Sequence, residues 1–190
     1  MGVPDSITLM NFILFILISL ILVWISRHTL KNYRSHGFYR FFVFEGIAAL
    51  LALNQPYWFN DPFSIRQMFS WALLICSIGF VLCAVKLLRA FGGYSRRDDM
   101  PENFTFENTA HLVDTGLYRF IRHPMYASLL LLNWGAFLKH ITPVTLSISV
   151  ITTLFLIAVA KVEEKENHIF FGEAYTEYCS KSKMFLPFLF

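Results

Sequence analysis

The segment 116–126 gathers side chains that could bind a ligand or take part in a reaction. It reads Gly-Leu-Tyr-Arg-Phe-Ile-Arg-His-Pro-Met-Tyr, so two arginines, a histidine and two tyrosines stand at the start of an apolar run. Such groups are costly at a membrane boundary unless they hold a partner. Pro124 suits the first turn of a helix, so we expect His123 at the N-cap, beside the positive end of the helix dipole. This segment is therefore the first candidate for a binding site.

A second polar cluster, residues 163–168, follows the last apolar run of the sequence. It contains three glutamates, a lysine, an asparagine and a histidine. Helical spacing places Glu163 and Asn167 on one face together with Phe170. In isolation, such a charge run is typical of a solvated helix face. We expect Gly172 to end this helix.

Taken together, the two clusters predict one joint site. The start of a helix offers amide donors, His111 and His123 offer rings, and Glu163 and Glu164 would balance a cationic group of a ligand. This mixture suits a zwitterionic, aromatic cofactor better than a metal, because no two histidines have the spacing of zinc ligands. Haem is disfavoured as well, because all six histidines fall at or beyond the ends of apolar runs.

The composition is that of an integral membrane protein. Apolar residues make up 56% of the chain and charged residues only 15%, whereas roughly 25% is usual for soluble chains. The net charge is +3, but the cations flank the apolar runs and form no continuous basic face. This pattern argues against nucleic acid as a partner. The three cysteines form no metal-type pair and are expected to be small core or lipid-facing residues.

Five apolar runs predict an all-α, polytopic membrane bundle of about five transmembrane helices. The runs are residues 7–25, 41–53, 69–88, 124–138 and 142–160. About 20 helical residues cross the hydrocarbon core. The second run is shorter and contains Glu45, so it must pack inside the bundle or lie partly in the interface. The first run lacks the basic start and the cleavage site of a signal peptide, so we expect a retained helix.

The basic residues predict the orientation of the chain in the membrane. They follow the first, third and fifth runs and precede the fourth, and the other connections carry only Arg66 and Lys139. Positive residues mark the cytoplasmic side, so we expect the amino terminus outside, with the carboxyl terminus and the site cytoplasmic. Residues 1–90 then carry the first three helices. Residues 91–190 carry a cytoplasmic loop, helices four and five and a C-terminal helical segment that forms the cofactor site.

These residues resemble the isoprenylcysteine carboxyl methyltransferase family and, more broadly, the small membrane methyltransferases that include phospholipid N-methyltransferases. The resemblance covers about the last half of the chain and is to the short five-span prokaryotic members, archaeal ones included. It rests on three blocks in order: His111-Leu112-Val113-Asp114-Thr115-Gly116-Leu117-Tyr118, then Arg122-His123-Pro124-Met125-Tyr126, then Glu163-Glu164 followed by Phe171-Gly172-x-x-Tyr175-x-x-Tyr178.

The resemblance implies S-adenosyl-L-methionine as methyl donor, S-adenosyl-L-homocysteine as product and no metal. It also implies a lipophilic acceptor that enters from the bilayer, foremost the carboxylate of an isoprenylated cysteine. A charged acceptor needs no base, because the rate comes from alignment of the reactants; for a neutral amine, Glu164 or His123 would take the proton. The cofactor-binding residues implied are His111, Leu112, Val113, Gly116, Tyr118, His123, Pro124, Tyr126, Glu163 and Glu164.

One departure from the family pattern concerns the acceptor. Eukaryotic members carry an arginine four residues before the paired glutamates, where this chain has Val159. A phospholipid or other lipid methyltransferase is therefore an alternative. An NADPH-dependent reductase of the sterol-reductase group is another, although Met125 stands where those proteins usually have asparagine. A third alternative is a membrane protein without catalytic activity whose polar clusters lock its helices together.

Overall fold

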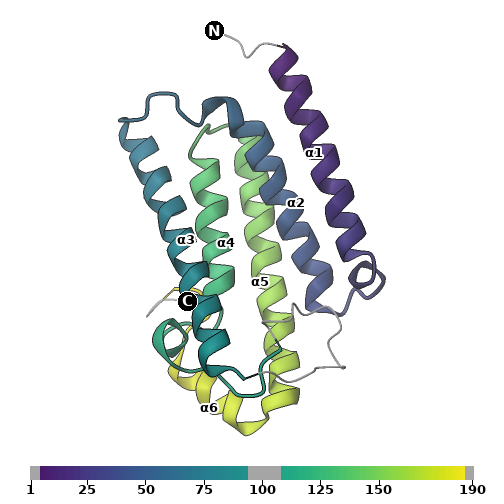
Figure 1. The fold of residues 1–190 in the computed structure, drawn as a ribbon, viewed down its shortest axis with the longest axis vertical. Helices are drawn as coiled ribbons and strands as arrows, with labels where there is room; N and C mark the ends of the chain where they lie inside the picture. The colour runs from purple at the N-terminus through teal and green to yellow at the C-terminus, as the bar shows by residue number, and fades with distance from the viewer. Residues whose placement is uncertain (1–4, 94–107, 187–190) are drawn as a thin grey trace.

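The computed structural model describes residues 5–93 and 108–186, which form a bundle of helices. The long helices lie in the order α3, α4, α5, α2 and α1 across the view of Figure 1 and run in alternating directions, and the short α6 lies across one end. Within the described residues the only β-type pairing is an isolated bridge between Ile121 and Lys183. The helices are α1 (Asp5–Ser26), α2 (His36–Asn54), α3 (Ile65–Phe91), α4 (Pro124–Phe137), α5 (Pro143–Phe171) and α6 (Glu173–Lys181), with short 3-10 turns η1 (Thr29–Lys31), η2 (Gln55–Tyr57) and η3 (Gly116–Arg119). The expected all-α polytopic bundle is confirmed.

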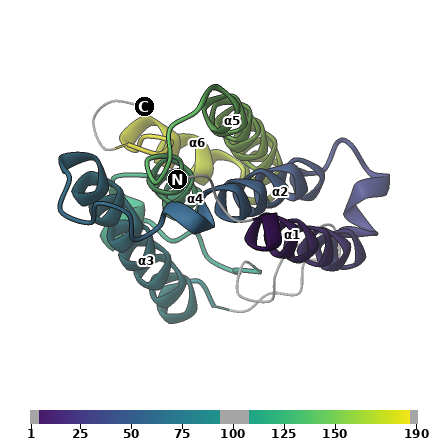
Figure 2. The same cartoon turned by 90° about the horizontal axis from the view of Figure 1, so that it is seen from above.

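Four of the described helices are long and apolar enough to cross a membrane: Leu9–Ser26, His36–Tyr57, Ile65–Phe91 and Pro143–Phe171. We expected about five membrane-spanning helices, and α4 is the one that is not among these four. This helix has 14 residues and therefore extends only about 21 Å, against about 30 Å for the hydrocarbon core. Viewed from above, α4 lies in the middle of the bundle, packed against α2, α3 and α5 (Figure 2). A short polar-capped helix is tolerated there because protein, not lipid, surrounds it.

Helix ends are set by local sequence. Thr142 accepts a hydrogen bond from the Thr145 amide, and the Thr145 side chain accepts from the Thr142 amide, so a capping box starts α5. Gly92 ends α3, and Gly172, with a φ of +59°, ends α5 as expected. The start of α2 was predicted wrongly. It begins at His36, five residues before the apolar run, so polar residues at 36 and 40 are helical.

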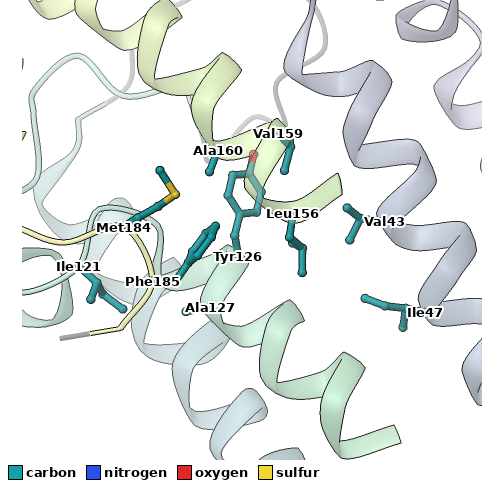
Figure 3. Packing of buried hydrophobic residues seen from close by; sticks show 10 residues of the cluster. All are labelled: Val43, Ile47, Ile121, Tyr126, Ala127, Leu156, Val159, Ala160, Met184 and Phe185. Atoms are coloured by element: carbon teal, nitrogen blue, oxygen red, sulfur yellow. The ribbon is translucent and has the colours of Figure 1, made fainter. Parts of the chain in front are cut away.

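The buried apolar core sits where α2, α4 and α5 meet the chain that follows α6. Tyr126 of α4 is one of the ten residues of this core and lies beside Val159 and Ala160 of α5 (Figure 3). Met184 and Phe185 belong to the same core and are almost completely buried. The apolar C-terminal stretch is therefore packed on the bundle at these two residues; residues 187–190 lie outside the described part.

The same C-terminal stretch is tied to the chain that leads into α4. Lys183 donates its amide to the Phe120 carbonyl at 2.9 Å, and the amides of Arg122 and His123 donate to the carbonyls of Lys183 and Met184 at 2.7 and 3.2 Å. These bonds satisfy backbone groups that have no helical partner. They hold the start of α4 against the end of the chain.

Candidate active site

A cavity opens at the end of the bundle where α4 begins and α5 leads into α6. Its walls come from α2, the end of α3, the segment before α4, α4 itself, α5 and α6. The residues that line it are His36, Leu88, Thr109, Leu112, Val113, Tyr118, Arg122, His123, Pro124, Met125, Tyr126, Glu163, Asn167, Phe171, Tyr175 and Tyr178. The two polar clusters of the sequence, some 40 residues apart along the chain, therefore share one cavity.

Most of the residues expected from the sequence border this cavity, and three do not. Glu164 lies behind it, where it binds cavity residues. Gly116 has a φ of +59° and packs against Leu87, on the wall of a neighbouring hollow. His111 is exposed, and its amide donates to the Gly92 carbonyl at 2.9 Å. The residues that do line it are Leu112, Val113, Tyr118, His123, Pro124, Tyr126 and Glu163.

His123 is the N-cap residue of α4, as expected, and Pro124 occupies the first turn. The His123 side chain makes no cap hydrogen bond with the helix. Its Nε2 instead lies 3.4 Å from Glu164 Oε1, and the Arg122 Nε donates to the same oxygen at 2.6 Å. Arg122 also donates to the Ser182 carbonyl at 2.5 Å. The Glu164 carboxylate therefore holds two basic side chains that line the cavity, Arg122 and His123.

Glu163, the residue before Glu164 in α5, has a different partner. It accepts a hydrogen bond from the Tyr126 hydroxyl, and the Tyr126 ring stacks against His123 with centroids 5.4 Å apart. Glu163 also interacts electrostatically with both His36 and His123. Glu163 is therefore the acidic side chain of the cavity lining, and its partners Tyr126, His36 and His123 line the same cavity.

Two tyrosines of α6 close the cavity. The Tyr178 hydroxyl donates to the Tyr118 carbonyl at 2.6 Å. Burial raises the pKa of both Tyr175 and Tyr178 above the ordinary value for a phenol. Both phenols are therefore neutral at physiological pH and serve as hydrogen-bond donors and packing surfaces.

Sequence reasoning missed several cavity residues, of which His36 is the most informative. Its Nδ1 lies 2.7 Å from Glu166 Oε2, and its backbone amide donates to Glu166 Oε1 at 3.3 Å. Nothing in a single sequence predicts that two residues 130 positions apart, His36 and Glu166, are in contact. The phenylalanine that lines the cavity with Glu163 and Asn167 is Phe171 and not Phe170. Their spacing of four residues each keeps these three on one stripe.

The chemistry of this lining fits a ligand that is both charged and aromatic. Glu163 and the basic side chains of His36, Arg122 and His123 line the cavity, and Leu88, Leu112, Val113 and Met125 supply apolar surface. The start of α4 adds backbone amide donors and the positive end of a helix dipole. Among residues 5–93 and 108–186, no group of three His, Cys, Asp or Glu side chains is placed to hold a metal ion.

Comparison with known proteins gives two matches. The sequence model of the phospholipid methyltransferase family matches residues 65–174, more than half of the chain. Methanethiol S-methyltransferase 1 of Bradyrhizobium diazoefficiens is 30% identical over 71 residues, which are 37% of this chain and 24% of that protein. The match therefore spans about a quarter of the relative's length. No solved structure matches the chain.

Proposed function

The chain belongs to the phospholipid methyltransferase family, and on this premise we propose that it is a membrane-embedded, S-adenosyl-L-methionine-dependent methyltransferase with a lipophilic acceptor. One observation carries the proposal. The start of α4, the Arg122 and His123 side chains that share Glu164 as a partner, and the Glu163–Tyr126 pair border a single cavity. Mixed charge beside apolar and aromatic walls is what a zwitterionic nucleoside cofactor requires.

Each part of the proposed cofactor has a counterpart in the cavity. The amides at the start of α4, with Arg122 and His123 nearby, suit its carboxylate. Glu163 suits its ammonium and sulfonium charges, and Leu112, Val113 and Tyr118 offer surface for adenine. When bound, the cofactor supplies a methyl group on a positively charged sulfur. Methyl transfer then depends on alignment and on exclusion of water, for which the buried rings of Tyr126, Tyr175 and Tyr178 are suited.

The acceptor in this proposal carries an apolar chain and arrives from the bilayer. The carboxylate of an isoprenylated cysteine, expected from the sequence, is one such acceptor, and a lipid head group is the other. The position of the family's arginine argues against the first. Val159 has no exposed surface and packs in the core beside Tyr126 (Figure 3). At this position α5 therefore offers an incoming carboxylate no cation.

We also propose that the cavity faces the cytoplasm and the amino terminus lies outside. In Figure 1, the cavity elements α6 and the end of α5 lie at the same end of the bundle as the α1–α2 connection. That connection holds Arg27, Lys31 and Arg34. Agreement between the basic residues and the position of the cavity supports this orientation.

The proposal is tested by isothermal titration of the detergent-solubilised protein with S-adenosyl-L-homocysteine and, separately, with NADPH. We expect the first to bind and the second not to bind. His123→Ala and Glu163→Gln should weaken binding about tenfold or more, that is ~1.4 kcal/mol. Glu173→Gln, an exposed α6 residue, should bind like the parent. A folded parent, verified by circular dichroism, that binds NADPH or neither compound would overturn the proposal.

A further inference from the structure

We propose that His36, oriented by Glu166, takes a proton from the acceptor, and hence that the acceptor is a protic nucleophile, a thiol or an amine, and not a carboxylate. The inference rests on the function proposed above and deepens it. His36 lines the cavity from α2 and is 1% exposed. Nothing in the family match, which begins at residue 65, includes it.

The contacts of Glu166 define which nitrogen of His36 is basic. One carboxylate oxygen faces Nδ1 at 2.7 Å and the other accepts from the His36 amide at 3.3 Å. A carboxylate can only accept, so Nδ1 carries the hydrogen in the neutral ring and the lone pair lies on Nε2. The same arrangement of carboxylate and imidazole prepares the base in many hydrolases. Glu166 is thus a positioning residue, and His36 is the group that meets the acceptor.

The other candidates for a base in the cavity are already engaged. Glu164 pairs with Arg122 and His123, and Glu163 accepts from Tyr126. Within the described part of the chain, the ring of His36 has a single hydrogen-bond partner, Glu166, and it makes that bond through Nδ1. This leaves Nε2 for a ligand in the cavity.

Charged groups of α2 and α5 surround the ring. Glu163 and Glu166 of α5 face His36, and Arg40, one turn along α2, is the nearby cation among the described residues. Two carboxylates stabilise the imidazolium that forms when the proton arrives. Glu163 interacts electrostatically with His36 and lines the same cavity, so the proton acceptor shares this cavity with the group assigned to the positive end of the cofactor.

A second hollow lies beside the neighbours of His36 in the chain. A hollow between the end of α1 and α2 is walled by Leu22, Ile25, Phe41 and Phe44, and it also includes Ser35 and Gly37, the two neighbours of His36. An amphiphile lying there with its chain toward the bilayer would place its polar end near Ser35 and Gly37, which flank His36 in the chain. The exposed apolar surface of α1 continues this hollow into lipid.

One proton and one methyl group are transferred in the proposed step. The acceptor loses one proton, from S–H or from an ammonium N–H, to Nε2 of His36. Its electron pair forms the new bond to the methyl carbon, and the bond from that carbon to the donor's sulfur breaks with its pair left on sulfur. The products are a thioether or a methylated ammonium ion, the homocysteine derivative with an uncharged sulfur, and protonated His36, which returns its proton to water.

The test compares the parent with His36→Gln in nanodiscs, with a long-chain thiol, a long-chain amine and a prenylcysteine carboxylate as separate acceptors. For the thiol or the amine, we expect His36→Gln to lower kcat by about 100-fold or more at neutral pH. The loss should shrink about tenfold per pH unit as the acceptor deprotonates by itself. The affinity for S-adenosyl-L-homocysteine, measured by titration calorimetry, should stay within about twofold of the parent, since His36 is not assigned to the cofactor.

Glu166→Gln keeps the ring and serves as the second variant. It should lower kcat by about tenfold with little change in KM, and it should alter the tautomer of His36 in 15N spectra of histidine-labelled protein. His140→Gln, at the far end of the bundle, is the matched control. The inference is overturned if His36→Gln binds the homocysteine derivative and transfers methyl like the parent, or if the carboxylate is the preferred acceptor. A parent that does not bind this derivative would instead refute the proposed function.

Discussion

Arg122 and Glu164 form an ion pair in which Nε of the guanidinium lies 2.6 Å from Oε1 of the carboxylate. Their side chains are only 13% and 17% exposed. Because Arg122 also donates to the Ser182 carbonyl, this pair joins three segments: the approach to α4, the end of α5 and the chain beyond α6. The cavity depends on the relative positions of all three.

Removal of Arg122 should therefore loosen this end of the protein. We expect Arg122→Met to lower the free energy of unfolding by about 3 kcal/mol, because it leaves Glu164 mostly buried with only His123 beside it. Arg119→Met is the control, since Arg119 is exposed. Thermal unfolding of the purified proteins in detergent measures both. Equal midpoints for the two variants would show that the pair contributes nothing.

The fold could be predicted from the sequence wherever apolar runs were long. α1, α3 and α5 follow from their runs, and Pro124 and Gly172 marked helix ends correctly. The start of α2 could not be predicted in this way. His36 and Arg40 interrupt the apolar pattern, and they are helical and buried because α2 packs along α5. Tertiary packing overrode the local signal there.

The candidate site was predictable only as far as its residues lie close together in sequence. The motif before α4 and the paired glutamates indicated two walls of the cavity. Arg122 was noted for its charge but not assigned to the site, and its bond to Glu164 appears only in the folded chain. The His36–Glu166 contact joins residues 130 positions apart, and a single sequence carries no sign of it. His111 and Gly116 lie in turns beside the cavity and not on its wall.

Close packing of α2 on α5 gives a second test. A Cβ atom at Gly46 would overlap Thr152 Oγ1, whereas one at Gly79 would meet nothing within 4 Å. Gly46→Ala should lower the free energy of unfolding by about 2 kcal/mol through overpacking. Gly79→Ala should be neutral or slightly stabilising, because alanine favours the helix. Thermal unfolding distinguishes them, and the double variant Gly46→Ala/Thr152→Ala should recover most of the loss. No recovery would mean that the helices do not touch at this point.

Lys139, at the opposite end of the bundle, predicts a pH dependence. Its side chain is fully buried, with Nζ 3.0 Å from Gln67 Oε1 and 3.5 Å from the Trp71 ring centroid. Burial, reinforced by the charge of Arg66, lowers its pKa from 10.5 to about 8. Between these values the unfolded state binds more protons than the folded state, so the free energy of unfolding should rise with pH from about 8 to about 10.5.

Midpoints of thermal unfolding across this range measure the effect. The parent should gain stability relative to Lys139→Met as the pH rises, because methionine cannot titrate. Lys86→Met, at an exposed position, should keep the slope of the parent. If parent and Lys139→Met changed in parallel, the pKa of Lys139 would not be lowered by folding.

The proposed orientation is open to a labelling experiment. Burial raises the pKa of the Cys179 thiol, which makes it a slow target for maleimides. We therefore suggest replacing all three cysteines by serine and introducing Ser180→Cys or Asn60→Cys, both at exposed positions. In intact cells an impermeant maleimide should label residue 60, and it should label residue 180 only after the cells are opened. The reverse pattern would place the cavity outside.

The proposed methyltransferase function is tested most directly by a methyl-transfer assay with the protein in lipid vesicles. S-adenosyl-L-methionine labelled with tritium on its methyl group is supplied together with a long-chain thiol, a long-chain amine or a prenylcysteine carboxylate. We expect the parent protein to transfer tritium to the thiol or the amine, which is recovered in the organic extract. Glu163→Gln should abolish this transfer. A folded protein that binds S-adenosyl-L-homocysteine but leaves all tritium in the aqueous phase with every acceptor would contradict the proposed methyltransferase function.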